Sequence, residues 1–206
     1  MWKLTLCLLC VALGVFASKF KVDRAMEKEL IVPEVIPVAP KQLLRVSYPN
    51  GVRAVCGKVL TPTQVKDQPS LKWPDVDADS FYTICLTNPD IPNRPERNGG
   101  EWLHWLAANV PGENVNAGEM LAEYVGSGPR PNSGLHRYVF LVYKQPSKLT
   151  FDDEPRITNR TAQKRDKFSI KSFALKHDLG TPVAGNFYLA EYDDYVPTIY
   201  KQLGVV

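Results

Sequence analysis

The 206-residue sequence is poor in the features that identify several large classes of protein. It has three histidines and four cysteines, without an HExxH spacing, and its one CxxC spacing, Cys7 to Cys10, lies in the apolar run near the start, so no metal site is expected. It also contains no GxSxG elbow for a nucleophilic serine, no GxxxxGK phosphate loop and no dinucleotide fingerprint. The net charge of +3 is too small to predict binding to nucleic acid. These absences disfavour the common hydrolases, nucleotide-binding enzymes and nucleic-acid-binding proteins.

No apolar run is long enough for a transmembrane helix, which needs about 20 residues. The longest run, residues 4–16, follows a short positive start and precedes Ala17, where a signal peptidase could cut. Residues 1–17 are therefore predicted to be a secretory signal peptide, and a membrane anchor is the alternative. The sequon that starts at Asn159 predicts glycosylation there, which agrees with a secreted, extracellular protein.

Removal of that signal would leave only two cysteines, Cys56 and Cys85. In an oxidising compartment they could form one disulfide. Each also occupies a core position of a strand-like run, where buried free cysteine is common. The sequence does not give the separation of the two Cα atoms, so both alternatives stay open.

Short strand-like runs separated by turns, with 17 prolines, indicate a mainly β protein. The expected helices are residues 22–30, 168–179 and 196–203, and the expected strands are residues 43–48, 52–56, 71–73, 81–87, 101–110, 137–143 and 187–192. Helices between the strands are missing, which favours an antiparallel sheet. Residues 18–42 are predicted to form a helix and a proline-rich connector, and residues 43–206 a single domain.

Two of the histidines, each with an aromatic residue two positions away, lie near the start of a predicted strand. Alternation places Trp102 and His104 on one face of one strand, and His136 and Tyr138 on one face of another. If these strands are neighbours, both imidazoles open into one pocket. Together with backbone N–H groups near Gly128, they would suit a phosphate or carboxylate. The alternative is that each histidine is an ordinary hydrogen-bonded structural residue.

A proline-locked loop, residues 88–94, follows the predicted strand 81–87. It carries one carboxylate, Asp90, and one guanidinium, Arg94. Taken alone, such a loop is a plain turn, because Asn and Asp often stabilise turns with their own side chains.

These segments together resemble the phosphatidylethanolamine-binding protein family. The two marker motifs of that family correspond to NPDIPNR at residues 88–94 and GLHR at residues 134–137, flanked by EWLHWLAANVPG and PVAGNFYLAEYDDYVP. The resemblance implies a large antiparallel Greek-key β-sandwich with short flanking helices near the N- and C-termini. It also implies a small surface pocket for phosphate-type anions or phospholipid head groups. By position, its residues are Asn88, Asp90, Pro92, Trp102, His104, Gly128, His136 and Tyr138, with Tyr200 closing one wall.

Two positions depart from the family pattern. Asn88 replaces the first acid of its motif, and Arg130 replaces a usual proline, which adds Arg130 to the expected ligand-binding residues. Both changes favour anions. We therefore expect a secreted, monomeric, non-catalytic binding protein without a cofactor. A serine-protease inhibitor is the alternative, and a hydrolase that uses the two histidines is a third hypothesis.

Overall fold

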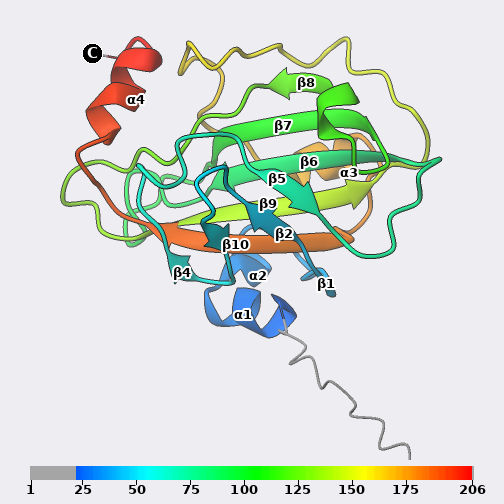
Figure 1. Ribbon diagram of the computed structural model, residues 1–206, viewed down its shortest axis with the longest axis horizontal. Coiled ribbons are helices and arrows are strands. Elements are labelled where there is room, and N and C mark those ends of the chain that lie inside the picture. Colours follow the sequence, from blue (N-terminus) through cyan, green and yellow to red (C-terminus); the bar gives the residue numbers. More distant parts are fainter. Residues whose placement is uncertain (1–21, 206) are drawn as a thin grey trace, which may run out of the picture.

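The computed structural model describes residues 22–205, a mainly β structure with a few short helices (Figure 1). The predicted signal peptide lies outside the described residues. The helices are α1 (Val22–Lys28), α2 (Ile31–Glu34), α3 (Ile170–Lys176), α4 (Val196–Gln202) and the 3-10 helix η1 (Val115–Ala117). The strands are β1 (Gln42–Leu43), β2 (Arg45–Ser47), β3 (Arg53–Ala54), β4 (Lys58–Val59), β5 (Ser70–Lys72), β6 (Phe81–Asn88), β7 (Trp102–Pro111), β8 (Glu119–Ala122), β9 (His136–Lys144) and β10 (Ala184–Ala190).

The main sheet has seven strands in the order β1-β10-β9-β6-β7-β8, and β4 also pairs with β10. The pairs from β10 to β8 are antiparallel, as predicted. The prediction is wrong at β1 and β4, which both run parallel to β10. These two-residue strands pair with β10 far along the chain and are not joined to it by a hairpin, so nothing forces an antiparallel arrangement. The Greek-key order of the connections stays a prediction.

A second, three-stranded sheet has the order β3-β2-β5. The predicted strand 43–48 is broken at Leu44, because β1 belongs to the main sheet and β2 to this one. The predicted turn before β3 is present, with Gly51 at a φ of 82° and its N–H donating to Tyr48. The chain thus passes from one sheet to the other within a few residues.

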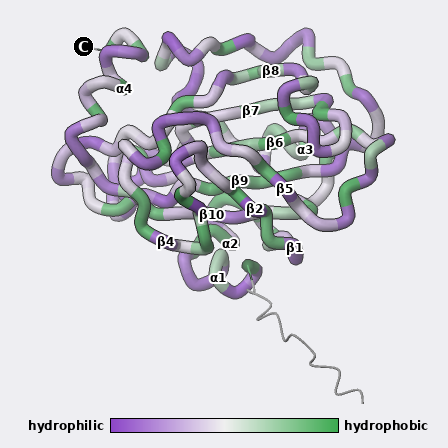
Figure 2. The backbone as a smooth tube through the Cα atoms, viewed as in Figure 1, coloured by the Kyte–Doolittle hydropathy of each residue, from purple (hydrophilic) through white to green (hydrophobic). Residues whose placement is uncertain are grey.

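The hydrophobic core is divided between the two faces of the main sheet, because successive side chains of a strand such as β6 point to opposite faces. Tyr82, Ile84 and Leu86 join the apolar cluster shared with the small sheet. Cys85 points to the other face, where it joins the cluster shared with α1, α2 and α3. The hydropathy of the chain follows this pattern, since hydrophobic residues recur along the central strands and the outer loops are largely hydrophilic (Figure 2). Alternation therefore fixes which side chains of each central strand reach which core.

Two of the predicted helices, 22–30 and 168–179, are shorter in the structure than their apolar spacing predicts. The predicted helix 168–179 begins only at Ile170, because the extended Ser169 caps it and accepts a bond from the Ser172 N–H through its side chain. The α4 helix agrees with its prediction and has Pro197 in its first turn. Within residues 22–205, none of the helices has the length and apolar character to cross a membrane.

The two cysteines of the described residues are free thiols, so of the two alternatives the disulfide is not formed. Cys85 lies in the middle of β6, whereas the N–H of Cys56 donates to the Asn186 side chain on β10. Because β9 lies between β6 and β10, the two cysteines are about two strand spacings, ~10 Å, apart. That separation exceeds what a disulfide can bridge.

Candidate functional site

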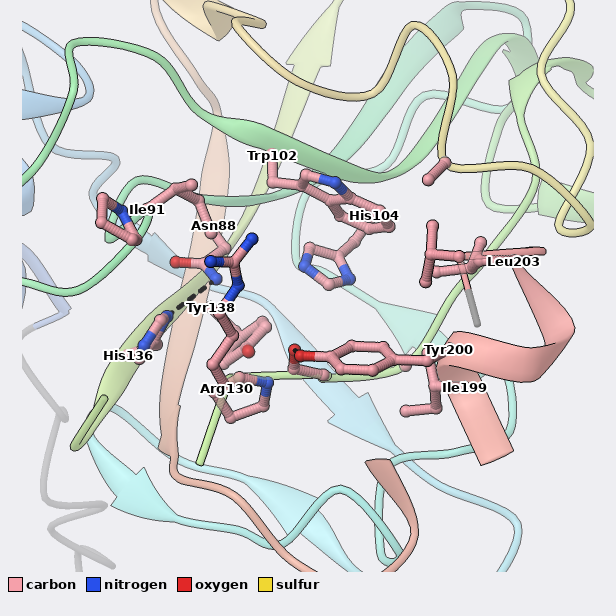
Figure 3. A pocket seen from close by; sticks show the side chains of 16 residues that line it. Asn88, Ile91, Trp102, His104, Arg130, His136, Tyr138, Ile199, Tyr200 and Leu203 are labelled. Atoms are coloured by element: carbon pink, nitrogen blue, oxygen red, sulfur yellow. Dashed lines mark hydrogen bonds between the residues drawn. The ribbon is translucent and has the colours of Figure 1, made fainter. Parts of the chain in front are cut away.

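A cavity of about 370 Å³ lies where β6 ends and where β7 and β9 begin, and α4 forms one of its walls (Figure 3). The structure brings nine of the ten predicted site residues to this cavity: Asn88, Pro92, Trp102, His104, Gly128, Arg130, His136, Tyr138 and Tyr200. Of the ten, only Asp90 does not line it. The polar groups gather on walls that are otherwise mostly apolar or aromatic.

The two histidines reach the cavity from strands that are not neighbours. His104 is on β7 and His136 on β9, and β6 lies between them in the sheet. The expectation of two adjacent histidine-bearing strands is therefore wrong, although both rings line one cavity. The strand between them contributes Asn88, its last residue, to the same cavity.

His136 lies in a chain of hydrogen bonds. Nδ2 of Asn88 donates to Nδ1 of His136 over 3.2 Å, and Nε2 of His136 donates to the Ser133 hydroxyl over 2.9 Å. That hydroxyl donates in turn to the carbonyl oxygen of Arg130 over 2.7 Å. Burial lowers the pKa of His136. The ring is therefore a neutral imidazole whose two nitrogens both have protein partners.

His104 presents a different hydrogen-bonding group to the cavity. Its Nδ1 lies 2.9 Å from the carbonyl oxygen of Val125, so Nδ1 carries the proton and donates it. Burial lowers the pKa of His104 to about 3. At neutral pH its Nε2 is consequently an unprotonated acceptor. From the sequence, either imidazole could have been protonated and positively charged. In the structure both are neutral at neutral pH.

An aromatic wall backs the cavity. The ring of His104 is 4.3 Å from that of Trp102 and 5.1 Å from that of Tyr138, and Tyr138 stacks on Tyr188 at 5.0 Å. The Tyr138 hydroxyl is buried and has no hydrogen-bond partner within residues 22–205. Burial raises its pKa, so the hydroxyl keeps its proton. A ligand in this cavity could accept the bond that the protein leaves unmade.

Arg130 and α4 define the open side. Arg130 is exposed and reaches over the same side of the cavity as Asn88 and His136 (Figure 3). Tyr200 points from α4 into the cavity, and its hydroxyl donates to the carbonyl oxygen of Gly128 over 3.2 Å. A β-carbon at Gly128 would lie 3.5 Å from Ile199 and 3.6 Å from Tyr200, which are ordinary van der Waals distances. Gly128 is therefore in close contact with the α4 wall.

Asp90 is placed behind the cavity by an ion pair. It is fully buried, and both of its carboxylate oxygens accept bonds from Arg137, at 2.6 Å from Nη2 and 3.0 Å from Nε. Arg137 also pairs with Glu34 of α2 at 2.7 Å. Alternation points Arg137 away from the face that carries His136 and Tyr138. Its ion pairs with Asp90 and Glu34 link the two marker motifs to α2. The ion pair that Asp90 makes with Arg137 could not be predicted from the sequence.

Several lining residues were not predicted, most of them on the side of α4. They are Ile91, Gly126, Pro129, Ala162, Ile199, Leu203 and Val205. The helical spacing of Ile199 and Leu203 was a usable signal, since both belong to a small apolar cluster with Val125. No local pattern marks Ala162, which reaches the cavity from a long loop.

Comparison with known proteins identifies the family to which the chain is similar. A family model described as phosphatidylethanolamine-binding protein matches residues 40–188. The putative odorant-binding protein A5 of Drosophila melanogaster is 41% identical over 182 residues, 88% of this chain and 86% of that protein. The 26 kDa secreted antigen of Toxocara canis is 39% identical over 163 residues, 78% of this chain and 61% of the antigen. A carboxypeptidase Y inhibitor, solved in complex with its cognate proteinase, has a TM-score of 0.71 at 25% identity and covers 86% of this chain and 98% of its own.

Proposed function

Because the chain belongs to the phosphatidylethanolamine-binding protein family, we propose that its cavity binds a phosphate-type anion, free or as a phospholipid head group. One observation carries this proposal. Arg130 is the single Lys, Arg, Asp or Glu among the described residues that line the cavity. With both imidazoles neutral, the lining has a net positive charge, which attracts anions.

The polar groups suggest how such an anion would be held. Arg130 and the hydroxyl of Tyr138 would donate to phosphate oxygens. The bare Nε2 of His104 would accept a hydrogen bond from a protonated phosphate oxygen. Inorganic phosphate at neutral pH and the singly protonated form of a phosphomonoester supply both kinds of group, whereas the phosphate of a phosphodiester, like sulfate, supplies only acceptors.

The size of the cavity limits the ligand. Its volume of about 370 Å³ is near the lower end of the range for small-molecule sites, roughly 300–1,000 Å³. A head group of the size of phosphoethanolamine would be accommodated. The acyl chains of a whole phospholipid would remain outside.

The proposed role is binding without catalysis. In the chain of bonds described above, each ring nitrogen of His136 already has a protein partner, so this ring is not poised to move a proton. Incubation with phospholipid and phosphomonoester substrates should give no turnover. Turnover that disappears in the His136→Ala variant would support a hydrolase instead.

We further propose that the protein is secreted, monomeric and glycosylated at Asn159. The name of the Toxocara canis relative contains the word secreted. Asn159 lies on a partly exposed loop, and its carbonyl oxygen accepts a 2.9 Å bond from Gln202 of α4. Native mass spectrometry of the protein secreted from its own host cells, before and after glycosidase treatment, tests all three properties. An unmodified Asn159 in the secreted protein would contradict the glycosylation.

Isothermal titration of inorganic phosphate and phosphoethanolamine tests the ligand class. We expect saturable 1:1 binding of both ligands and tighter binding of phosphate, because Asn88 and Arg130 make the site less favourable for an ammonium group. The effect of one unit charge at a few ångströms is about 1–4 kcal/mol. Clearly tighter binding of phosphoethanolamine would contradict this preference, and no binding of either ligand would contradict the proposed function.

The second candidate function is inhibition of a serine protease. It is favoured by the similarity to the carboxypeptidase Y inhibitor, which was solved with its proteinase. Inhibition assays against trypsin-like proteases and carboxypeptidase Y distinguish the two functions. A protein that only binds anions leaves protease rates unchanged, whereas a dose-dependent decrease that phosphate does not relieve would support inhibition through another surface.

A further inference from the structure

The aromatic wall of the cavity has a buried arginine behind it. Arg165 is fully buried, and its side chain donates only to backbone carbonyl oxygens. The five acceptors, at 2.9–3.3 Å, belong to Leu103, His104, Glu123, Thr158 and Thr161. They lie on β7, just after β8 and in the loop between β9 and α3, so one side chain holds three segments together near the cavity.

Arg165 differs from the other fully buried arginine in its charge balance. Arg137 has carboxylate partners in Asp90 and Glu34. For Arg165, no ion pair with a carboxylate is found within residues 22–205, and all its bonds go to uncharged oxygens. Although burial lowers its pKa to about 10, the guanidinium still carries its positive charge at neutral pH. Among residues 22–205, Arg165 is therefore a buried cation without a directly paired carboxylate, and Glu123 acts on it only at longer range.

That cation is close to the ligand cavity. The guanidinium carbon of Arg165 lies 5.4 Å from the centre of the Trp102 ring, which is 4.3 Å from the ring of His104. Both rings line the cavity. The backbone of Arg165 is also held to β7, because its carbonyl oxygen accepts the Leu103 N–H over 2.8 Å. Hydrogen bonds therefore hold both the backbone and the charged side chain of Arg165 against β7.

We infer that Arg165 is the fixed charge that makes the cavity favour anions, and that it also positions Trp102. This inference rests on the proposed function. Solvent and salt screen the exposed Arg130, whereas a buried charge is screened much less. Because both imidazoles are neutral, they contribute no positive charge to the cavity. Arg165, behind the aromatic wall, supplies a positive potential there without touching the ligand.

Two substitutions separate the charge of Arg165 from its hydrogen bonds. Arg165→Lys and Arg165→Gln both remove the forked donor, but only the lysine keeps a cation. By titration with inorganic phosphate, we expect the glutamine variant to bind roughly tenfold more weakly than the lysine variant, as for a unit charge behind one ring layer. Equal affinities in the two variants would show that Arg165 acts only through packing and would overturn the inference.

A measurement on the unaltered protein covers the case in which loss of the five bonds prevents folding. Phosphate is titrated at low and at high ionic strength, because salt screens the exposed Arg130 much more than the buried Arg165. We expect the dissociation constant to change by less than roughly threefold between about 0.02 M and 0.3 M salt. A loss of affinity of roughly tenfold or more would mean that exposed charge alone holds the anion, and would overturn the inference while the proposed function stands. Absence of phosphate binding by the unaltered protein would contradict both.

Discussion

The side-chain nitrogen of Asn88 donates a 3.2 Å hydrogen bond to Nδ1 of His136. The amide cannot be turned round, because its oxygen already accepts the N–H of Asp90 at 2.9 Å. Since an amide nitrogen only donates, Nδ1 of His136 is unprotonated and the ring proton lies on Nε2. Asn88 therefore determines which nitrogen of His136 carries the proton. Asn88 is also one of the two positions at which the sequence departs from the family pattern.

Replacement of Asn88 by aspartate should reverse that arrangement. A carboxylate beside Nδ1 favours the charged imidazolium, so we expect Asn88→Asp to raise the pKa of His136. The added negative charge should also shift the ratio of the two dissociation constants toward phosphoethanolamine by roughly tenfold. Histidine NMR titration and calorimetry measure the two effects.

The matched control for this substitution is Asn98→Asp, the same chemical change on an exposed side chain outside the cavity. It should leave both the histidine titration and the ligand preference close to those of the unaltered protein. Equal effects of the two substitutions would contradict a specific role for Asn88.

Loss of the Tyr138 hydroxyl should weaken binding without weakening the fold. The hydroxyl is buried and has no hydrogen-bond partner among residues 22–205, so Tyr138→Phe removes no hydrogen bond found in this part of the chain. A bond to a charged ligand contributes about 1.5–3 kcal/mol, and phosphate affinity should fall accordingly. The control is Tyr188→Phe, which breaks the 2.6 Å bond to Ser127 and should lower stability instead. Unchanged phosphate affinity in Tyr138→Phe would exclude a direct contact.

His104 should make the fold sensitive to acid. Its pKa falls from 6.5 to about 3 on burial, so between these values the unfolded chain binds a proton that the folded protein does not. The free energy of unfolding therefore decreases as the pH falls, by about 2 kcal/mol between pH 7 and 5 from this group. Glu101, whose pKa burial raises to about 7, acts in the opposite direction between 4.5 and 7.

The effect of His104 is isolated by comparison with His104→Gln, in which the contribution of Glu101 is retained. Urea unfolding at pH 7 and pH 5 should show that the unaltered protein loses about 2 kcal/mol relative to the variant. Parallel pH dependences of the two proteins would contradict a neutral, buried His104.

Asp90 should matter for stability and not for ligand contact. Asp90→Asn leaves Arg137 buried with one carboxylate fewer, which should cost about 3 kcal/mol or more in urea unfolding. Asp77→Asn, which affects the exposed pair with Lys144, should cost much less. Because Asp90 does not line the cavity, folded Asp90→Asn should bind phosphate within roughly threefold of the unaltered protein. A stable variant that does not bind phosphate would restore Asp90 as a ligand residue.

Local patterns predicted the central strands because their side chains alternate between two cores. Tyr82, Ile84 and Leu86 on β6 are an example. The same patterns did not reveal β8, whose residues Glu119–Ala122 include no β-branched side chain, or the two-residue β4. Such short strands are defined by the neighbour with which they pair, and that pairing is a long-range property of the chain.

The site shows the same limit. Alternation and the motifs placed Trp102, His104, His136 and Tyr138 at one cavity. They did not show that Asp90 faces Arg137, nor that Arg165 lies behind Trp102. Those contacts depend on carboxylate and carbonyl groups from segments far apart in the sequence, so they follow only from the three-dimensional structure.

The central claim, that the cavity among β6, β7, β9 and α4 holds a phosphate-type anion, is tested most directly by titrating inorganic phosphate into the ¹⁵N-labelled protein and following its amide resonances. We predict saturable shifts that are largest at Gly128, Arg130 and His104, with one dissociation constant for all three. Resonances that do not move at millimolar phosphate, or that move only at residues remote from this cavity, would contradict the account.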